Sequence, residues 1–523
     1  MKLIINHFNV KNRYLPILML GACCVKSVYA ETNSNNSSKS ELGKPNVIFI
    51  YADDMGKGML SAYGQKYIST PNIDKLIQGG VQFSNCYGAH FSAPARASLL
   101  TGYSDCKADI WNNPKGNLIV ADTAEVAPIE AILDAMHIKL EEGDDYLAEV
   151  FNKAGYVTGE VGKLEYAFAS TRSQVKAHGW SYYYGYLDHG ACHGFFPPFL
   201  YENGEIVMIE GNTMTGCGKE VARVWDESHY DMTGRKQYSQ DLFNDKIEAF
   251  LETNKDKPFF LYHPTQLPHG PVGVPYVHEQ VKYLPNLTDV EKEYATMVIL
   301  LDEAVGKILK KVEELGIADN TMIVFSNDNG HEIYTESAGR TASYHNVHTG
   351  EVIDNYNVRY TTENVGDIFN GNMGMSGKKR GNFDGSINVP LCYYMPSKLT
   401  PRVCDEVVAN YDFIATMAQL VGVDISEKKT ARSYLELLTD KDATLPKERF
   451  VIVDSYEGPA LMTNDGWKIR YCNVTDKYEL YNLDNDYKEL NELSGQYPEI
   501  TEKLSKLMES EVETTMTRGG YLF

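Results

Sequence analysis

The chain has 523 residues, enough for a large buried core and, on length alone, for two or three domains. Its 43% hydrophobic and 23% charged residues are typical of a globular protein. The formal net charge of -22 argues against nucleic acid and anionic membrane surfaces as partners, because the whole molecule would repel them.

The N-terminal segment has the features of an export signal. Basic side chains precede an apolar run from Tyr14 to Val25, and small residues follow up to Ala30. This pattern predicts a signal peptide over residues 1–30 and export to the periplasm. The alternative is a lipoprotein anchored through Cys23. Residues 31–43 are polar and are expected to form a flexible tether, and no later run is apolar and long enough to span a bilayer.

The cysteines show no spacing typical of a metal site. Seven of the nine follow residue 30 and are widely scattered. Cys192 with Cys217, or Cys392 with Cys404, could pair in an oxidising compartment. A buried free thiol is the default expectation for each.

The first predicted strand ends in two aspartates. Its sequence, VIFIY over residues 47–51, is continuously apolar, which indicates a strand buried on both faces of a parallel sheet. Asp53 and Asp54 follow at the end of the strand where α/β sheets place their ligands. An isolated Asp-Asp pair is more often a solvated loop, so its interpretation depends on later motifs. Thr70-Pro71 then predicts the start of a helix that runs to Gly79.

The stretch from Phe91 to Gly102, FSAPARASLLTG, carries the most specific motif of the chain. Its pattern S-x-P-x-R-x-x-x-L-T-G resembles the signature of the type I sulfatases, formylglycine-dependent members of the alkaline-phosphatase-like superfamily. The resemblance implies that Ser92 is oxidised to formylglycine (3-oxoalanine) by an anaerobic-type formylglycine-generating maturase. Ala95 departs from the family, which usually has Ser there. The alternative interpretation is a Ser/Ala-rich turn that enters a helix.

The next part of the family pattern is present with one departure. A helix over residues 144–154 and a strand over 156–161 are predicted to precede Lys163 and Glu165. Sulfatases usually have G-K-W-H at this place, so Lys163 matches and Glu165 stands where a His is expected.

An aromatic, His-rich segment follows over residues 178–198 and contains too many Gly and Pro residues for a regular element. Its aromatic side chains could line a sugar-binding site, or they could pack beneath a long loop. His178, His193, Trp180 and Tyr184 are the predicted sugar-binding residues, with His178 reading a hydroxyl next to the sulfate. The segment resembles glycan sulfatases of gut bacteria, which implies exo-action on galactose sulfated at O3 in host mucin-type glycans.

A further strand leads to a candidate histidine. A helix over residues 241–253 precedes a strand over 259–262, and the P-H-G-P sequence beyond it resembles the P-H-x-P segment of sulfatases. This resemblance nominates His269. The long helix predicted over residues 293–315 has an apolar stripe typical of a core helix.

The second metal segment of the family follows a strand predicted over residues 321–326. The chain reads N-D-N-G there, whereas the family has S-D-N-G, and the resemblance nominates Asp328 and Asn329. The family also has a Lys five residues before an acid-Gly pair, which selects Lys379 over Lys378.

Near residue 440 the predicted elements change to short strands separated by turns. The resemblance implies an α/β fold in which a large central, mostly parallel sheet is flanked by helices and a smaller C-terminal antiparallel subdomain follows. The expected division is a catalytic domain over residues 44–440 and a subdomain over 441–523. The large domain is predicted to end with a strand over 390–394 and a helix over 411–421, and the subdomain to contain strands over 450–455, 460–463, 467–472 and 478–482.

The candidate ligands point to a hard cation. Asp53, Asp54, Asp328 and Asn329 offer only oxygen atoms, which suit calcium or magnesium rather than zinc. The resemblance implies Ca²⁺, with Mg²⁺ as the alternative, and the side chain of residue 92 as a further ligand.

The resemblance also assigns chemical roles. Arg96 would fix the modified residue 92, and Lys163 and Lys379 would neutralise sulfate oxygens. His269 would protonate or polarise the leaving sugar oxygen, and Glu165 would act as a base or as a supporting group.

Two other functions remain open at the level of sequence. A phosphoester hydrolase of the same superfamily usually has two metals and a His after the second Asp, so Asn329 favours one metal and sulfate. A non-catalytic glycan-binding paralogue would explain the departures at Ala95 and Glu165.

Overall fold

The computed structural model describes residues 42–107, 111, 116, 118–136, 140, 143–163, 165–335, 361, 365–473 and 475–512. The predicted signal peptide, Cys23 and most of the predicted tether lie outside the described residues. Within the described part, no helix is long and apolar enough to cross a membrane.

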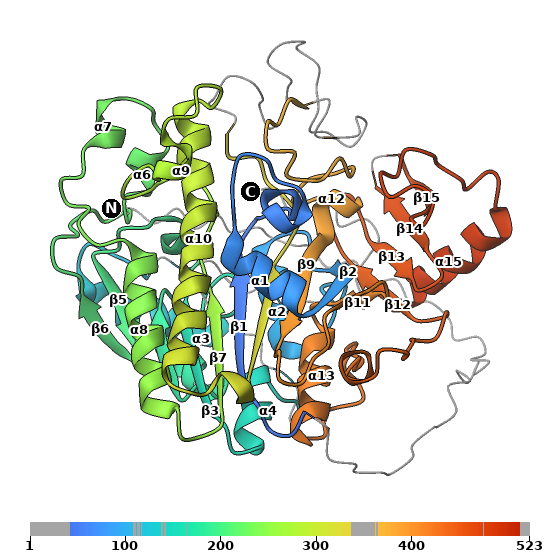
Figure 1. Ribbon diagram of the computed structural model, residues 1–523, viewed down its shortest axis with the longest axis horizontal. Coiled ribbons are helices and arrows are strands. Elements are labelled where there is room, and N and C mark those ends of the chain that lie inside the picture. The colour runs from blue at the N-terminus through green and yellow to red at the C-terminus, as the bar shows by residue number, and fades with distance from the viewer. Residues whose placement is uncertain are drawn as a thin grey trace, which may run out of the picture. The chain divides into compact units, whose positions relative to one another are not determined.

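A mixed sheet of eleven strands forms the centre of the described structure and confirms the predicted α/β architecture (Figure 1). Five neighbouring strands run parallel in the order β8, β1, β7, β3, β4. These strands are β1 (Asn46–Ala52), β3 (Val157–Gly162), β4 (Tyr182–Gly185), β7 (Phe259–Pro264) and β8 (Thr321–Asn327). The sheet continues beyond β8 with β9 (Asn388–Tyr394), β2 (Val81–Tyr87), β10 (Arg402–Cys404) and β11 (Val408–Ala409), and beyond β4 with β5 (Phe199–Glu202) and β6 (Glu205–Met208).

Helices cover both faces of the parallel strands. Successive residues of a strand point to opposite faces, and in β7 the ring of Phe259 contacts Phe250 whereas the ring of Phe260 stacks on Phe151 at 4.1 Å. Phe250 belongs to α8 and Phe151 to α4, so these two helices lie on opposite faces. In one group α10 (Asp289–Glu314) packs against both α1 (Pro71–Gly79) and α8 (Ser239–Asn254), and in the other α2 (Ser92–Thr101), α4 (Leu147–Lys153) and α13 (Asp412–Val421) contact one another.

Shorter helices connect these elements. They are η1 (Lys57–Met59), η2 (Ser61–Tyr63), η3 (Thr123–Glu125), α3 (Val126–Met136), α5 (Arg172–Ala177), η4 (Ala191–His193), α6 (Lys219–Ala222), α7 (Glu227–Tyr230), α9 (Glu279–Lys282), η5 (Ala318–Asn320), α12 (Asp384–Ile387) and α14 (Glu436–Thr439).

Two expectations from the sequence are corrected. The segment 178–198 is not wholly irregular, because residues 182–185 form β4 and pair with β3 in parallel. This long-range pairing outweighs the local Gly and Pro signals. The helix predicted to begin at residue 144 begins at Leu147, because Tyr146 is its N-cap and its backbone N–H donates to Glu149.

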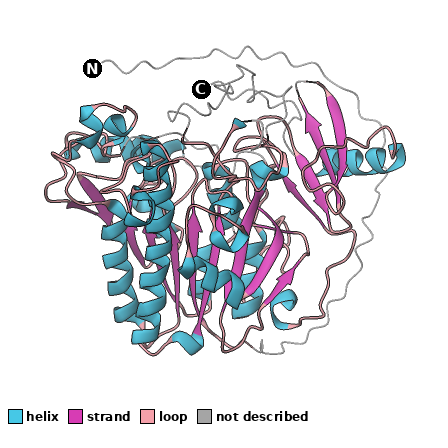
Figure 2. Cartoon of the chain, turned by 45° about the horizontal axis from the view of Figure 1, so that its top comes forward, coloured by secondary structure: helices cyan, strands magenta, loops and turns pink. Residues whose placement is uncertain are grey.

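A separate antiparallel sheet follows in the C-terminal part of the described chain (Figure 2). Its strands pair in sequence order, and the terminal helix packs on three of them. Val451 and Val453 of this sheet join a buried apolar cluster with Tyr87 and Tyr411, which ties the small sheet to the large one. The elements are β12 (Phe450–Val453), β13 (Ala460–Thr463), β14 (Trp467–Cys472), β15 (Lys477–Asn482) and α15 (Pro498–Glu511).

A buried ionic cluster also joins the small sheet to α12 (Asp384–Ile387), which leads into β9. Lys468 Nζ of β14 lies 2.7 Å from Asp384 Oδ1 and 2.8 Å from Glu489 Oε1, and all three side chains are buried. The Asp384 N–H also donates to Glu489 at 2.6 Å. This cluster fixes α12, which directly follows the segment that carries Lys379.

All described cysteines are free thiols. Neither of the two pairings considered from the sequence forms, and all of these thiols except that of Cys404 are buried. The default expectation of buried free thiols is therefore met at the remaining positions.

Candidate active site

The candidate site lies where the parallel strands end. Strands β1, β8, β7 and β3 run in the same direction, so their carboxyl ends share one edge of the sheet. Asp53 and Asp54 follow β1, and Asp328 and Asn329 follow β8. All four of these side chains are completely buried.

Ser92 and Arg96 reach the same aspartate from helix α2. The two residues are four positions apart, so they share one face of the helix. Ser92 Oγ donates to Asp53 Oδ1 at 2.9 Å, and Arg96 Nη2 donates to Asp53 Oδ2 at 2.9 Å. Ser92 is the first residue of α2, where free backbone N–H groups and the helix dipole favour an anion. The spacing of the signature motif is therefore that of one helical turn.

The backbone at the end of β1 locks the second aspartate against β8. Asp54 adopts a left-handed backbone conformation (φ 62°), which is uncommon outside glycine. Its N–H donates to Asp328 Oδ1 at 3.0 Å. Gly330 is required beside it, because a Cβ there would collide with the carbonyl oxygen of Gly385.

The donor set fits a hard cation. Asp328 Oδ1 accepts two backbone N–H groups, but Asp328 Oδ2 and Asn329 Oδ1 accept no hydrogen bond from any described residue although both are buried. Burial and the nearby Asp53 and Asp54 carboxylates raise the pKa of Asp328. A divalent cation would supply a partner for both oxygens and remove the repulsion among the carboxylates.

A second donor set includes nitrogen. Asp53, Asp54 and His269 each offer an atom within 4.8 Å of the others. His269 Nε2 lies 3.2 Å from Asp54 Oδ2. The two buried oxygens of Asp328 and Asn329 favour the all-oxygen set, because a site centred on His269 would leave Asn329 Oδ1 without a hydrogen bond and Asp328 Oδ2 with only the Arg96 guanidinium, 3.6 Å away.

Three cations surround the aspartates. Lys163 Nζ, at the end of β3, contacts Asp53, and Lys379 Nζ lies 2.6 Å from Asp54 Oδ2. Burial alone would raise the pKa of Asp53. Lys163, Arg96 and Lys379 outweigh burial and hold that pKa well below its usual range. Lys378, in contrast, donates to Glu332 at 3.3 Å and does not contact Asp54.

His269 and a tyrosine complete the contacts to Asp54. His269 Nδ1 donates to the Gly270 carbonyl oxygen, so Nε2 is the nitrogen directed at Lys379, 3.5 Å away. Burial and the positive charges of Lys163 and Lys379 hold the pKa of His269 well below its usual value. The Tyr334 hydroxyl donates to Asp54.

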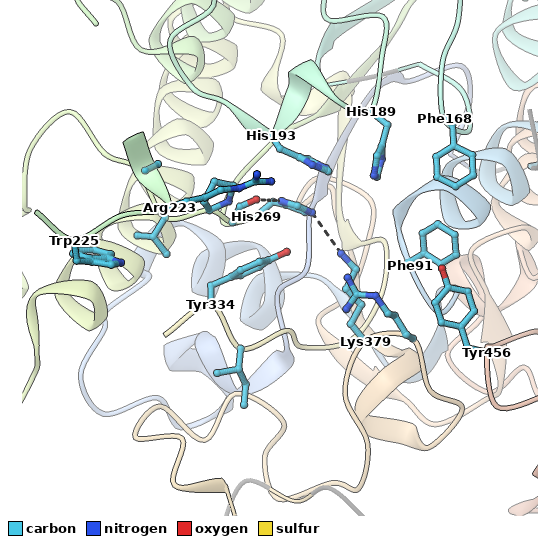
Figure 3. A pocket seen from close by; sticks show the side chains of 16 residues that line it. Phe91, Phe168, His189, His193, Arg223, Trp225, His269, Tyr334, Lys379 and Tyr456 are labelled. Carbon is cyan, nitrogen blue, oxygen red and sulfur yellow. Dashed lines mark hydrogen bonds between the residues drawn. The ribbon is translucent and has the colours of Figure 1, made fainter. Parts of the chain in front are cut away.

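A pocket of about 390 Å³ opens beside these residues, within the size range of small-molecule sites (~300–1,000 Å³). In Figure 3, His269, Tyr334 and Lys379 lie in its middle. Three aromatic side chains, Phe91, Phe168 and Tyr456, lie at one end, and Arg223 and Trp225 lie at the other.

The structure places Glu165 outside the pocket. Its carboxylate is buried and accepts hydrogen bonds from His178 Nδ1 at 2.8 Å, Trp180 Nε1 at 3.1 Å and Ser170 Oγ at 2.7 Å. Glu165, His178 and Trp180 therefore form one hydrogen-bonded cluster, and none of them lines the pocket. These contacts favour the supporting role of Glu165 over the role of a base, the two alternatives that the sequence left open.

The structure places most of the expected sugar-binding residues outside the pocket. Tyr184 is buried beside Phe243 and the ammonium of Lys246, away from the pocket. Of the four expected residues, His193 alone lines the pocket. Its ring stacks on His269 with the centroids 4.1 Å apart.

Several pocket residues were missed by sequence reasoning. Tyr334 lies shortly after the metal segment at the end of β8, and Arg380 is next to Lys379. Their closeness to these motifs was the signal that could have identified them. His189 lies in the aromatic segment from which other residues were chosen. Trp225 and Tyr456 come from parts of the chain without any motif, so no sequence signal pointed to them.

Comparisons with known proteins show the family of this chain. The family model described as Sulfatase matches residues 45–423, and the one described as N-sulphoglucosamine sulphohydrolase, C-terminal, matches residues 371–515. A Bacteroides thetaiotaomicron protein named N-acetylgalactosamine-6-O-sulfatase is 25% identical, over 95% of this chain and 98% of its own length.

Solved structures share the fold. One, from work on glycosaminoglycan metabolism by Bacteroides thetaiotaomicron, has a TM-score of 0.66 at 22% identity and covers 89% of this chain and 99% of its own. Another was solved with its substrate D-glucosamine-2-N,6-O-disulfate, with a TM-score of 0.59 at 17% identity, and covers 91% of this chain and 100% of its own.

Proposed function

This chain belongs to the sulfatase family and hydrolyses sulfuric esters of glycans, and we propose that it does so with a nucleophile formed from Ser92 and one divalent cation. The observation that carries the proposal is the contact of Ser92 Oγ with Asp53, inside the cluster of buried carboxylates and cations. A serine hydroxyl reacts poorly with a sulfate ester, whereas the hydrated aldehyde of formylglycine supplies one hydroxyl for attack on sulfur and another whose deprotonation releases sulfate.

Side chains of this protein would orient residue 92 and neutralise the charge of the sulfate group. Arg96 and Asp53 hold the side chain of residue 92 from two sides. Lys163 and Lys379 approach the same place from β3 and from the segment before α12, where they would neutralise sulfate oxygens in the transition state. In the absence of substrate both lysines are paired with aspartates, which keeps their ammonium groups in position.

His269 is placed to act on the leaving oxygen. It lines the pocket beside Lys379, and its Nδ1–H is held by the Gly270 carbonyl oxygen. A bound sulfate would place negative charge next to the ring and raise the pKa of His269. Nε2 could then carry the proton that the leaving sugar oxygen takes up.

Asp53, Asp54, Asp328 and Asn329 would hold the cation, with the oxidised side chain of Ser92 beside them. Ca²⁺ suits four oxygen donors, and Mg²⁺ is the alternative. When bound, the cation would polarise a sulfate oxygen and help to orient residue 92.

Chelation is expected to lower both the melting temperature and the activity. Without a cation, three buried carboxylates remain close together, which costs several kcal/mol in repulsion and desolvation. The measurement is thermal unfolding by circular dichroism, with and without EDTA, followed by addition of Ca²⁺ or Mg²⁺. Elemental analysis that finds two zinc ions per chain would contradict the proposed site.

The proposed substrate is a sulfated, galacto-configured sugar at the end of a glycan. The prediction of O3-sulfated galactose depended on His178, which is hydrogen-bonded to Glu165 outside the pocket. That support is removed. The relative that matches nearly the whole chain is named for N-acetylgalactosamine 6-O-sulfate, so we favour the O6 position. Export to the periplasm and oxidation of Ser92 by a maturase complete the proposal.

A panel of sulfated sugars tests the position. Galactose and N-acetylgalactosamine carrying sulfate at O3, O4 or O6 would be compared by sulfate release, together with the matching phosphate esters. We expect kcat/KM to be highest for an O6-sulfated sugar. A preference for O3-sulfated galactose would restore the position predicted from the sequence, and faster release of phosphate would favour a phosphoester hydrolase.

A further inference from the structure

We propose that Trp225 and Arg223 form a second sugar subsite, which binds a neutral pyranose attached to the sulfated sugar. The inference rests on the proposed function and extends it from a single sugar to at least a disaccharide. Both residues line the pocket, at the end opposite Phe91, Phe168 and Tyr456 (Figure 3).

Trp225 is supported as a stacking surface. Its ring stacks on His229 with the centroids 4.1 Å apart and the planes at 28°. His229 is buried, and its Nε2 lies 3.0 Å from the Glu293 carboxylate in helix α10. One face of the indole is therefore backed by a residue anchored to the longest helix described. The side chain remains partly exposed and lines the pocket, where a pyranose ring can stack on it.

Arg223 supplies hydrogen-bond donors beside that surface. It is the C-cap residue of α6, two positions before Trp225, and it is exposed. It forms an exposed ion pair of 3.5 Å with Glu220, which holds an arginine only weakly. The guanidinium can therefore turn toward sugar hydroxyl or acetamido oxygens without losing a strong partner.

The charges around this end of the pocket favour a neutral sugar. Glu220, Asp226 and Glu227 are all exposed within a few residues of Arg223 and Trp225. In residues 219–227 these three carboxylates outnumber the two cations, Lys219 and Arg223, and the whole chain carries a formal charge of -22. A uronate or a second sulfate at this position would be repelled, whereas a hexose or N-acetylhexosamine would not. The cations that attract sulfate lie in the middle of the pocket instead.

The test compares ligands that differ only in the second sugar. N-acetylgalactosamine 6-sulfate would be titrated calorimetrically alone, linked to galactose and linked to glucuronate. The titrated protein would be the Ser92→Ala variant, which binds substrate without turnover. We expect the galactose-linked ligand to bind about tenfold more tightly than the monosaccharide, as one stacking contact with a hydrogen bond would give, and the glucuronate-linked ligand no more tightly.

Substitutions identify the residues responsible. In the Ser92→Ala background, Trp225→Ala is expected to remove the tenfold difference in affinity between the galactose-linked ligand and the monosaccharide, and to leave the affinity for the monosaccharide unchanged. Trp225→Phe is expected to keep part of that difference. Tyr487→Ala, at an exposed aromatic residue that does not line the pocket, is the matched control and is expected to change neither.

Two outcomes separate this inference from the function on which it rests. Equal affinity for the monosaccharide and the galactose-linked ligand, or tighter binding of the glucuronate-linked one, would overturn the subsite alone. If N-acetylgalactosamine 6-sulfate does not bind, the same titrations would be made with galactose 3-sulfate, alone and linked to the same second sugars. Absence of binding in both series would contradict the proposed function and the subsite together.

Discussion

Replacement of Ser92 by Ala is expected to lower kcat by about 10⁶-fold, the scale seen when a nucleophile is removed from an enzyme. Alanine has no oxygen that can be oxidised to formylglycine, so no hydrated aldehyde can form. The fold should persist, since the substitution removes one hydrogen bond of 2.9 Å to Asp53, worth about 1 kcal/mol. Asp53 would still be paired with Lys163 and Arg96.

The matched control is Ser98→Ala in the same helix. Ser98 is also buried in α2, but its hydroxyl has no hydrogen-bond partner among the described residues. Both variants would be compared with the wild type by sulfate release and thermal unfolding, and mass spectrometry of the wild-type peptide would report oxidation of Ser92. Full activity of Ser92→Ala, or unmodified Ser92 in an active enzyme, would refute the assignment.

Replacement of Lys468 by Met is expected to destabilise the protein by about 3–5 kcal/mol, as when one partner of a buried ion pair is removed. Lys468 lies between Asp384 and Glu489, and all three side chains are buried. Methionine has a similar length but no charge, so two carboxyl groups would be left facing each other away from water. Burial already raises the pKa of Glu489. Activity should also fall, because α12 positions the segment that carries Lys379.

Urea unfolding monitored by circular dichroism would measure this effect. Lys506→Met is the matched control, since Lys506 forms an exposed pair with Glu502 within one helix, and its unfolding midpoint should not change. A double variant with Lys468→Met and Glu489→Gln should recover part of the loss. The interpretation fails if Lys468→Met unfolds at the same urea concentration as Lys506→Met.

Asp53, Asp54, Lys163, Asp328 and Asn329 could be found in the sequence because each follows a recognisable strand, whereas Lys379 was found from its spacing to an acid-Gly pair. The apolar runs before Asp53 and Asp328 predict buried strands, and parallel strands bring their carboxyl ends to one edge. Ser92 and Arg96 were found from their spacing, which the helix α2 converts into a shared face. In these cases the geometry of a single strand or helix decides where the side chain lies, so the local sequence pattern is enough to predict its position.

The sugar-binding residues could not be found in this way. His178 and Trp180 have the chemistry of a sugar site, yet both donate to Glu165 in a buried cluster. Whether an aromatic or histidine side chain faces a pocket or the core depends on what packs around it, and composition does not contain that information. Glu165 is a similar case, since its place in a motif left a catalytic and a supporting role open and its three hydrogen-bond donors favour the supporting one.

The sequence by itself determined the family, most strands of the parallel core along the chain and the residues of the aspartate and lysine cluster at their ends, because these follow from short-range spacing. Only the tertiary structure decided which residues complete the pocket. Trp225 comes from the segment between two short helices, and Tyr456 from the loop after β12, more than 200 residues away in the sequence. They meet at one pocket because burial of apolar surface brings distant segments together, and that burial is a property of the whole fold.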